Sequence, residues 1–421
     1  MTRVTPHSVV RTPYSMRSPL LPVFLIVLLD MLGVGIIIPV LPALFMTPET
    51  SILPPDTSEA QRSIWYGYLV AIYPLMQFFG APVLGALSDR YGRKPLLMLS
   101  LAGTLVGYLL FGWAIMIGNL PLLFISRALP GFTGGNISIV FSAISDITVH
   151  RPADRPKYFG LVGMAFGLGF ILGPALGGVL ADNSVVSWFD HSTPFWFTAI
   201  LTFANIGLLW LIFPETLKEK RDSRLNFLTG FANIRKAFSS PNLRGIFVVS
   251  LFLSLGFSFF TQFFSVYLIQ RFNMSVKDIG LIFAWVGLWL IFTQGFTVRR
   301  LSAKFKSAQL LRYTILFLSI AIPMVLLPEN PWNILWVNPL IATFQGITAP
   351  NLTAVVSAQA TPQEQGEILG INQSMVSVGQ TLPPVIAGYL SSVNGSYPIL
   401  AGGVMIFIGW LVFMAIQSRL K

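Results

Sequence analysis

Long apolar runs separated by short polar segments make up most of the chain. Each run holds about the 20 residues that an α-helix needs to cross a hydrocarbon core about 30 Å thick. We predict twelve membrane-spanning helices, at residues 20–46, 64–87, 95–117, 120–146, 158–181, 194–213, 244–270, 278–298, 309–327, 332–358, 367–391 and 397–417. The pattern therefore predicts an all-α integral membrane protein.

Composition and charge agree with this pattern. Charged residues form 10% of the 421 residues, whereas a soluble domain carries about 25%. The net charge of +11 follows membrane topology, because Arg62, Arg271 and Lys277 fall on one side, Arg127 lies inside a predicted helix, and all other lysines and arginines fall on the opposite side. The positive-inside rule makes that opposite side cytoplasmic, together with both termini. No nucleic-acid partner is needed to explain the charge.

One long basic connection divides the chain. It contains a predicted short interfacial helix around residues 227–238. We predict a cytoplasmic tail at 1–19, a six-helix bundle at 20–213, a basic cytoplasmic linker at 214–243, a second six-helix bundle at 244–417 and a tail at 418–421.

The two halves look like copies of one another. Gly85 recurs 210 positions later as Gly295, and Gly160 recurs at the same offset as Gly370. In transporters built from repeats, the substrate site lies between the repeats near the middle of the membrane. One half then rocks against the other to give alternating access.

A charged island of ten residues, Gly85–Lys94, separates the second and third runs. We interpret it as a short turn on the cytoplasmic side. Gly85 is expected to let two backbones approach closely, and Asp89 to lie against the positive end of a helix dipole. Gly92 is expected to permit a tight chain reversal before the third helix.

Two charged residues lie deep inside predicted helices, away from the helix ends. Asp30 stands about ten residues into the first run, where an ionised carboxylate is costly unless it is protonated or paired. Arg127 lies in the fourth run and is followed by small residues that admit a neighbouring helix. We expect Asp30 to take up a proton from outside and to release it inside, while Arg127 tunes its proton affinity. The alternative is a static buried pair, or separate bonds to backbone groups.

The fifth run is rich in glycine, and glycines four apart pack closely against another helix. Its central members are Gly169, Gly173, Pro174, Gly177 and Gly178. The expected substrate cavity is uncharged, aromatic and rich in amides, and its candidate residues are Gln77, Asn136, Gln262, Trp285, Gln345, Asn351, Gln373 and Gln380. For any one of these residues, a helix–helix hydrogen bond or lipid contact is the alternative.

The sequence also excludes several classes of protein. Cysteine is absent, and the three histidines lie in the tail and in loops, so neither thiol chemistry nor a metal site is expected. No Walker-type nucleotide motif occurs, so ATP is not the energy source. The predicted helices hold neither a nucleophile–base pair nor paired carboxylates, which argues against an enzyme. We expect no cofactor, with the proton as coupling ion.

The motifs carry a family resemblance. The island Gly85-Ala-Leu-Ser-Asp-Arg-Tyr-Gly-Arg-Lys94 resembles the signature loop of the major facilitator superfamily. The segments that begin at Asp30, Arg127 and Ser145 are similar to those of drug:proton antiporters, particularly bacterial tetracycline efflux proteins. The resemblance implies the twelve-helix major facilitator fold and proton coupling through Arg127. It also implies that the glycines of the fifth run form the antiporter motif, and that gating involves Gly85, Asp89, Arg90, Gly92, Arg93, Lys94 and Asp146.

One departure bears on the substrate. Tetracycline exporters carry an aspartate where Gly107 stands and another acid in helix nine, which has none here. This difference argues against a metal–tetracycline chelate. We predict a proton-coupled antiporter that exports amphipathic small organic molecules, as in drug efflux; the alternative is a proton symporter or facilitator for a small metabolite. We expect a monomer in a bacterial inner membrane.

Overall fold

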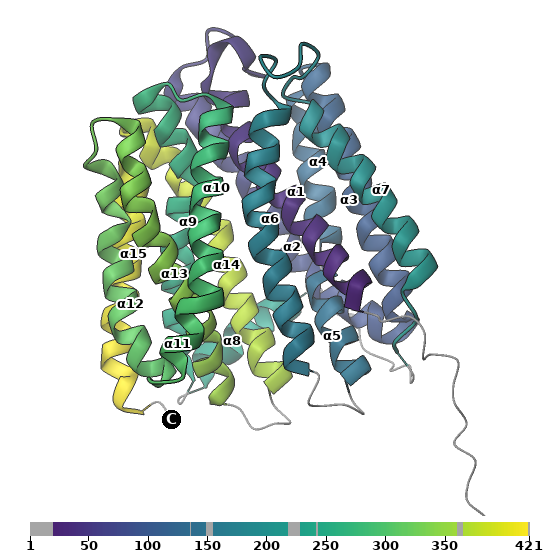
Figure 1. Cartoon of the computed structure of the whole chain (residues 1–421), viewed down its shortest axis with the longest axis vertical. Coiled ribbons are helices and arrows are strands. Elements are labelled where there is room, and N and C mark those ends of the chain that lie inside the picture. Colours follow the sequence, from purple (N-terminus) through teal and green to yellow (C-terminus); the bar gives the residue numbers. More distant parts are fainter. Residues whose placement is uncertain are drawn as a thin grey trace, which may run out of the picture.

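The chain folds into two bundles of helices that stand side by side (Figure 1). The computed structural model describes residues 20–134, 136–148, 155–217, 228–240, 243–359 and 365–419. The first bundle comprises α1 (Leu20–Met46), α2 (Glu59–Tyr91), α3 (Arg93–Met116), α4 (Leu120–Thr133), α5 (Asn136–Thr148), α6 (Arg155–Leu180) and α7 (Thr193–Ile212). The second comprises α9 (Arg244–Phe272), α10 (Val276–Phe292), α11 (Arg299–Ser302), α12 (Ser307–Ala321), α13 (Ile334–Ala358), α14 (Gln365–Val393) and α15 (Tyr397–Ile416).

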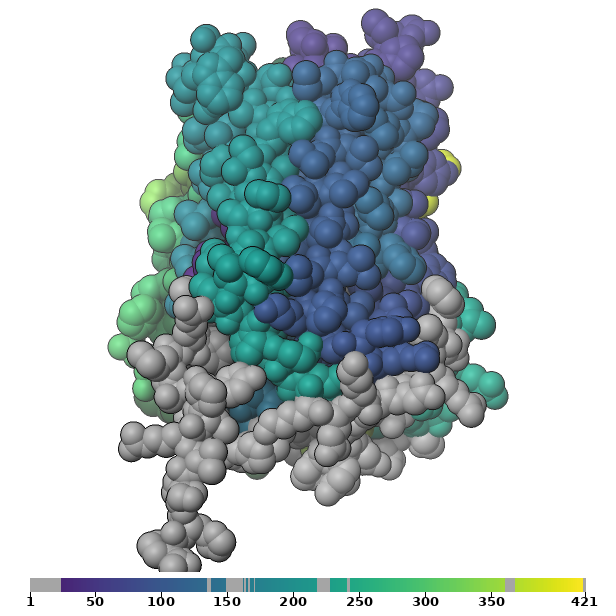
Figure 2. Space-filling model, turned by 90° about the vertical axis from the view of Figure 1, so that its right-hand side faces the viewer, coloured from purple at the N-terminus to yellow at the C-terminus, as the bar shows by residue number. Residues whose placement is uncertain are grey.

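The helices present an apolar surface to their surroundings. In the part of the chain that the structure describes, eight helices are long and apolar enough to cross a membrane. Figure 2 shows the flank formed by α3 (blue) and α7 (teal), where Trp113, Ile200 and Phe203 are each more than half exposed. Large exposed apolar side chains of this kind suit contact with lipid tails. The predicted all-α membrane fold is confirmed.

The predicted turn in the charged island is wrong. Helix α2 continues as far as Tyr91, and α3 begins at Arg93. The reversal is therefore confined to Gly92, whose φ of 117° lies in a region that other residues rarely adopt. The role expected of Gly92 is confirmed, but the rest of the island is helical.

The fourth predicted span is made of two helices instead of one. Helix α4 ends at Thr133, and α5 begins at Asn136. The neighbouring helices supply donors where α4 ends: Ser100 Oγ donates to the Thr133 carbonyl, and Gln77 Nε2 donates to the Gly134 carbonyl at 3.0 Å. Backbone groups outside a regular helix need such partners at membrane depth.

The eighth predicted span is also irregular. Helix α10 passes into a π-helical segment, Thr293–Val298, before α11 completes the span. This segment contains Gly295, which is the counterpart of Gly85 in the first half. The two halves therefore differ locally at corresponding places.

The described part of the linker contains one helix, α8 (Thr229–Ser239), close to the predicted range. Its Gly230 lies against the ring of Phe78 on α2, and its Asn233 Nδ2 donates to Ser374 Oγ on α14 at 3.1 Å. Helix α8 therefore contacts both bundles, through α2 of the first and through α9 and α14 of the second, at the end of the molecule that carries the island (Figure 1). Phe227, the first residue of the predicted range, falls outside the described residues.

Candidate functional site

The candidate proton site lies within the first bundle. Asp30 is partly buried on α1, and Arg127 lies on α4. The guanidinium of Arg127 stacks over the ring of Tyr73 on α2, with Cζ 4.7 Å from the ring centroid. Its Nε is buried and has no acceptor among the described residues. The charge of Arg127 is thus held against an aromatic ring.

Two tyrosines lie within electrostatic range of both Asp30 and Arg127. The hydroxyl of Tyr108 lies against Gly33, one helical turn after Asp30. Both Asp30 and Arg127 interact electrostatically with Tyr73 and with Tyr108. The sequence analysis missed both tyrosines, because an aromatic residue in an apolar run carries no signal that separates a site residue from a packing residue.

Gly107 has a packing role in this chain. A Cβ at this position would lie 2.7 Å from Pro130 Cγ and 3.1 Å from the Ser126 carbonyl oxygen. An aspartate here would collide with α4. The close contact between α3 and α4 therefore requires a residue without a side chain at position 107.

The island is joined to its neighbours by charged hydrogen bonds. Arg93 is buried and forms ion pairs with Asp89 at 2.6 Å and with Asp146 on α5 at 3.1 Å. It also donates to Ser88 Oγ at 2.6 Å. Arg90 stacks on Tyr91, with Cζ 5.7 Å from the ring centroid. These contacts bring Asp89, Arg93 and Asp146 of the predicted gating motif together.

Glu215, which follows α7, is a further member of this cluster. Its carboxylate accepts hydrogen bonds from the backbone nitrogens of Arg93 at 2.9 Å and Lys94 at 3.2 Å, and so caps the amino end of α3. A side chain at Gly92 would collide with the same carboxylate. The Lys94 ammonium donates to the Trp210 carbonyl at 2.7 Å. The sequence analysis missed Glu215 because it lies more than a hundred residues from the island.

The glycines of α6 face two different helices. Gly169 packs on Met31, a Cβ added at Gly173 would lie 2.7 Å from the Gly35 Cα, and Gly177 packs on Ile36, so this row follows α1 just beyond Asp30. Gly178 and the Pro174 carbonyl oxygen face Gly280 on α10 of the second bundle, while the Pro174 ring packs on Gly35 of α1. The motif thus joins the helix of Asp30 to the other half of the molecule.

The candidate cavity residues have varied environments. The Gln77 amide is bonded to the end of α4, as described above. Asn351 is buried and its Nδ2 donates to the Ile347 carbonyl of its own helix at 2.8 Å. Trp285 Nε1 donates to the Leu335 carbonyl at 3.0 Å. Gln262 and Gln345 are partly buried, whereas Gln373 and Gln380 are exposed, and the side chain of Asn136 is outside the described residues.

The two bundles are locked together at the distal end, which we define as the end opposite the island. Tyr66 packs on Phe263 with ring centroids 5.2 Å apart, and its hydroxyl donates to the Gln262 carbonyl at 2.7 Å. The hydroxyls of Tyr68 and Tyr389 lie 2.6 Å apart. A side chain at Gly67 would collide with the Pro384 carbonyl oxygen.

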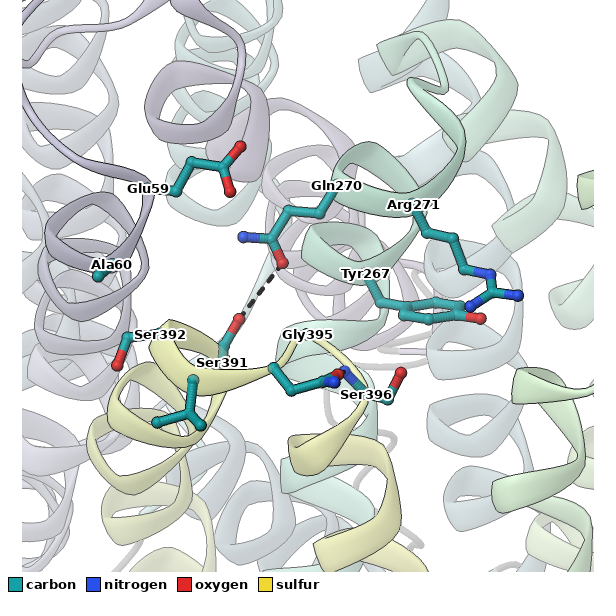
Figure 3. A pocket seen from close by; sticks show the side chains of 11 residues that line it. Glu59, Ala60, Tyr267, Gln270, Arg271, Ser391, Ser392, Gly395 and Ser396 are labelled. Carbon is teal, nitrogen blue, oxygen red and sulfur yellow. Dashed lines mark hydrogen bonds between the residues drawn. The ribbon is translucent and has the colours of Figure 1, made fainter.

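Polar contacts complete the distal closure. A small pocket of about 250 Å³ lies there, between the start of α2 and the ends of α9 and α14. Figure 3 shows Ser391 Oγ donating to the Gln270 side-chain oxygen at 3.4 Å beside this pocket. An ion pair, Asp182–Lys277 at 3.5 Å, joins the end of α6 to the start of α10.

The island end is packed differently. No described atom outside the helix's own backbone would lie within 4 Å of a methyl group placed at Gly85, Gly295 or Gly370. The expectation of a close backbone contact at Gly85 is therefore wrong for this conformation. Helices α2 and α14 are therefore in close contact at Gly67, whereas no described neighbour packs on Gly85 or Gly370 at the island end, where α8 contacts both bundles.

This architecture matches known transporters. The family model of the Major Facilitator Superfamily matches residues 23–344. The chain belongs to this superfamily. Major facilitator proteins with similar sequences include the class H tetracycline resistance protein of Pasteurella multocida, which is 31% identical over 394 residues covering 91% of each chain. The class B tetracycline resistance protein of Escherichia coli is 30% identical over 406 residues, covering 93% of this chain and 91% of that protein.

A solved structure gives the same fold. The human organic anion transporter MFSD10 (TETRAN) superposes with a TM-score of 0.71 at 23% identity, covering 94% of this chain and 98% of that one. Membership of the superfamily makes this chain a multi-pass membrane transporter of a small-molecule substrate.

Proposed function

We propose that this protein exports amphipathic small organic molecules in exchange for protons, by alternating access between its two bundles. The observation that carries the proposal is the unequal packing of α2 against α14. Gly67 is in contact at the distal end, while Gly85 and Gly370 are uncovered at the island end. A conformation with one end closed is one of the two that alternating access requires.

The two charged residues inside the first bundle support the proton as the coupling ion. Asp30 and Arg127 lie in α1 and α4, away from the helix ends. An ionisable group inside a membrane span is by default a candidate for a proton relay. The glycine row of α6 packs on α1 next to Asp30 and also reaches α10 of the second bundle. Protonation of Asp30 is therefore well placed to influence how the bundles pack.

The relatives support export as the direction. Two of them are named for resistance to tetracycline, and resistance through a membrane transporter requires removal of the drug. The collision that an aspartate at position 107 would meet favours a substrate other than the metal–tetracycline chelate. We place the island end in the cytoplasm of a bacterial inner membrane, so that the described conformation faces inward.

Proton flux in proteoliposomes tests the proposal. Vesicles with a fluorescent pH reporter and an acidic lumen receive a panel of lipophilic cations and metabolites. We expect at least one lipophilic cation to discharge the gradient with the parent protein and not with Asp30→Asn. Glu329→Gln, at an exposed loop position, serves as the control and should behave like the parent. Equal discharge by Asp30→Asn would refute Asp30 as the proton site.

A further inference from the structure

Helix α8 carries a face that the two bundles do not cover. Its Gly230 and Ala237 are buried. Phe231 and Phe238, in contrast, are each 51% exposed, and Arg235 between them is exposed as well. Residues that are three, four and seven apart lie on one side of a helix. These three side chains therefore form a single stripe, which we call the exposed face of α8.

The exposed face lies beside the seam between α2 and α14, on the side that suits lipid. On α2 this side carries Tyr68 and Leu75, which are seven residues apart and each 38% exposed. Phe79 comes four residues after Leu75 and so continues the same side of the helix. The ring of Phe231 packs on the ring of Phe79, with centroids 6.0 Å apart. Large exposed apolar side chains on a membrane-spanning helix suit contact with lipid tails, so α8 borders a lipid-facing surface.

The depth of α8 along the bundles agrees with this location. Its Gly230 lies against the ring of Phe78, nine residues inside the island end of the second predicted span. Its Asn233 donates to Ser374, seven residues inside the island end of the eleventh predicted span. At 1.5 Å per residue, both contacts lie about 10–14 Å inside the apolar spans. An amphipathic helix buries its apolar face about 5–10 Å into the boundary between headgroups and acyl chains, so α8 lies near that boundary.

The charge of this region selects the kind of headgroup. Residues 218–244 contain seven lysines and arginines but only two acidic residues. Arg235 stands between two exposed aromatic rings, and a long basic side chain can extend to the headgroups while its apolar neighbours remain among the acyl chains. Basic segments beside a membrane are attracted by anionic lipids. The exposed face of α8 thus combines apolar contact with a positive charge.

We propose that the exposed face of α8 is a docking surface for an anionic phospholipid of the leaflet on the island side. Arg235 pairs with its negatively charged headgroup, and Phe231 and Phe238 contact its acyl chains. Because α8 also contacts α2, α9 and α14, the lipid lies at the junction of the two bundles. This inference goes beyond the proposed function and does not depend on it.

A fluorescent reporter on α8 tests the surface in the full chain. Ser239→Cys places a single thiol one helical turn after Arg235, in a protein that has no natural cysteine, and this thiol is labelled with bimane. The labelled protein is reconstituted in phosphatidylcholine nanodiscs. Increasing fractions of the lipid are replaced by phosphatidylglycerol or by phosphatidylcholine that carries a nitroxide on an acyl chain. A nitroxide quenches bimane at short range only, so quenching reports which lipid lies against α8.

We expect nitroxide-labelled phosphatidylglycerol to reach half-quenching at about one fifth of the fraction that labelled phosphatidylcholine needs, the preference that one basic side chain near a membrane surface provides. Arg235→Gln should remove this preference, whereas Arg235→Lys, which keeps the charge, should retain it. Arg300→Gln is the matched control, because Arg300 is an exposed arginine of α11 at the same end of the molecule, and it should keep the parent preference. Phe238→Ala should weaken quenching by both lipids.

Three results overturn the inference. Absence of quenching by either lipid would place the exposed face of α8 in water. Equal quenching by the two lipids would show that the face selects no headgroup. An equal loss of preference in Arg235→Gln and Arg300→Gln would reduce the effect to the general positive charge of this end. The assay involves no transport, so lipid docking and the proposed function stand or fail separately.

Discussion

Adding one methyl group at Gly67 should shift the balance between the two conformations. In the described conformation that methyl group would collide with the Pro384 carbonyl oxygen across the interface between α2 and α14. The obstacle is backbone and cannot rotate away, so the helices have to separate. Overpacking of this kind costs about 1–3 kcal/mol. A conformation in which the distal end is open avoids that cost.

The expected change follows from this difference. A bias of about 1–3 kcal/mol corresponds to a roughly 5–150-fold change in an equilibrium between two states. Gly85→Ala is the matched control, since it adds the same methyl group to the same helix where no described atom of another element lies within 4 Å. Any gain in helix propensity applies to both variants. Gly67→Ala should therefore favour distal opening, and Gly85→Ala should not.

The absence of natural cysteine makes the assay direct. Ser391→Cys places a single thiol at the distal end, where the serine side chain is 5% exposed. In this background, the labelling rate with a membrane-impermeant maleimide reports distal opening. We expect Gly67→Ala to label faster than the parent and Gly85→Ala to label at the parent rate. Equal rates in folded Gly67→Ala and the parent would refute the reasoning.

Three further predictions concern stability and the linker. Glu215→Ala should lower the thermal midpoint of the detergent-solubilised protein through loss of the α3 cap, worth about 0.5–2 kcal/mol, whereas the exposed Glu329→Ala should not; equal midpoints would contradict the cap. Burial lowers the pKa of His191, against a smaller opposing effect of Asp190. The neutral imidazole therefore contributes to folding stability above pH about 6.5, and this contribution is lost as the pH falls through the lowered pKa. His191→Asn should therefore lose less thermal stability than the parent between pH 7.5 and pH 5; an identical loss would rule this out. In the double variant Asn233→Cys and Ser374→Cys, oxidation should form a disulfide that fixes α8 to α14 and stops transport until reductant is added. Continued transport by the cross-linked protein would show that this contact persists throughout the cycle.

Hydropathy and motif spacing predicted much of this molecule, for physical reasons. A membrane-spanning helix satisfies its own backbone hydrogen bonds, so an apolar run of sufficient length is enough to specify it. The depth of Asp30 within α1 and the reversal at Gly92 were predicted for the same local reasons. The membrane-transporter fold could therefore be predicted from the sequence alone.

Contacts between distant segments could not be predicted. The cap that Glu215 provides for α3 depends on where α7 ends in space, and the contact of Tyr73 with Arg127 depends on how α2 crosses α4. The end of α4 at Thr133 was hidden because the apolar run continues through it. In the proposed alternating access, the exposure of Gly85 depends on which of the two conformations is described, and one sequence encodes both.

The most direct test of the central claim is the accumulation of tetraphenylphosphonium against its gradient. Proteoliposomes with an acidic lumen and a clamped membrane potential are compared with vesicles that have an alkaline lumen, each with the parent protein and with Asp30→Asn. Proton antiport predicts accumulation in the acidic vesicles only, and its loss in Asp30→Asn. Accumulation in the alkaline vesicles would indicate a symporter, and equilibration without accumulation would indicate a facilitator; either result would contradict the account.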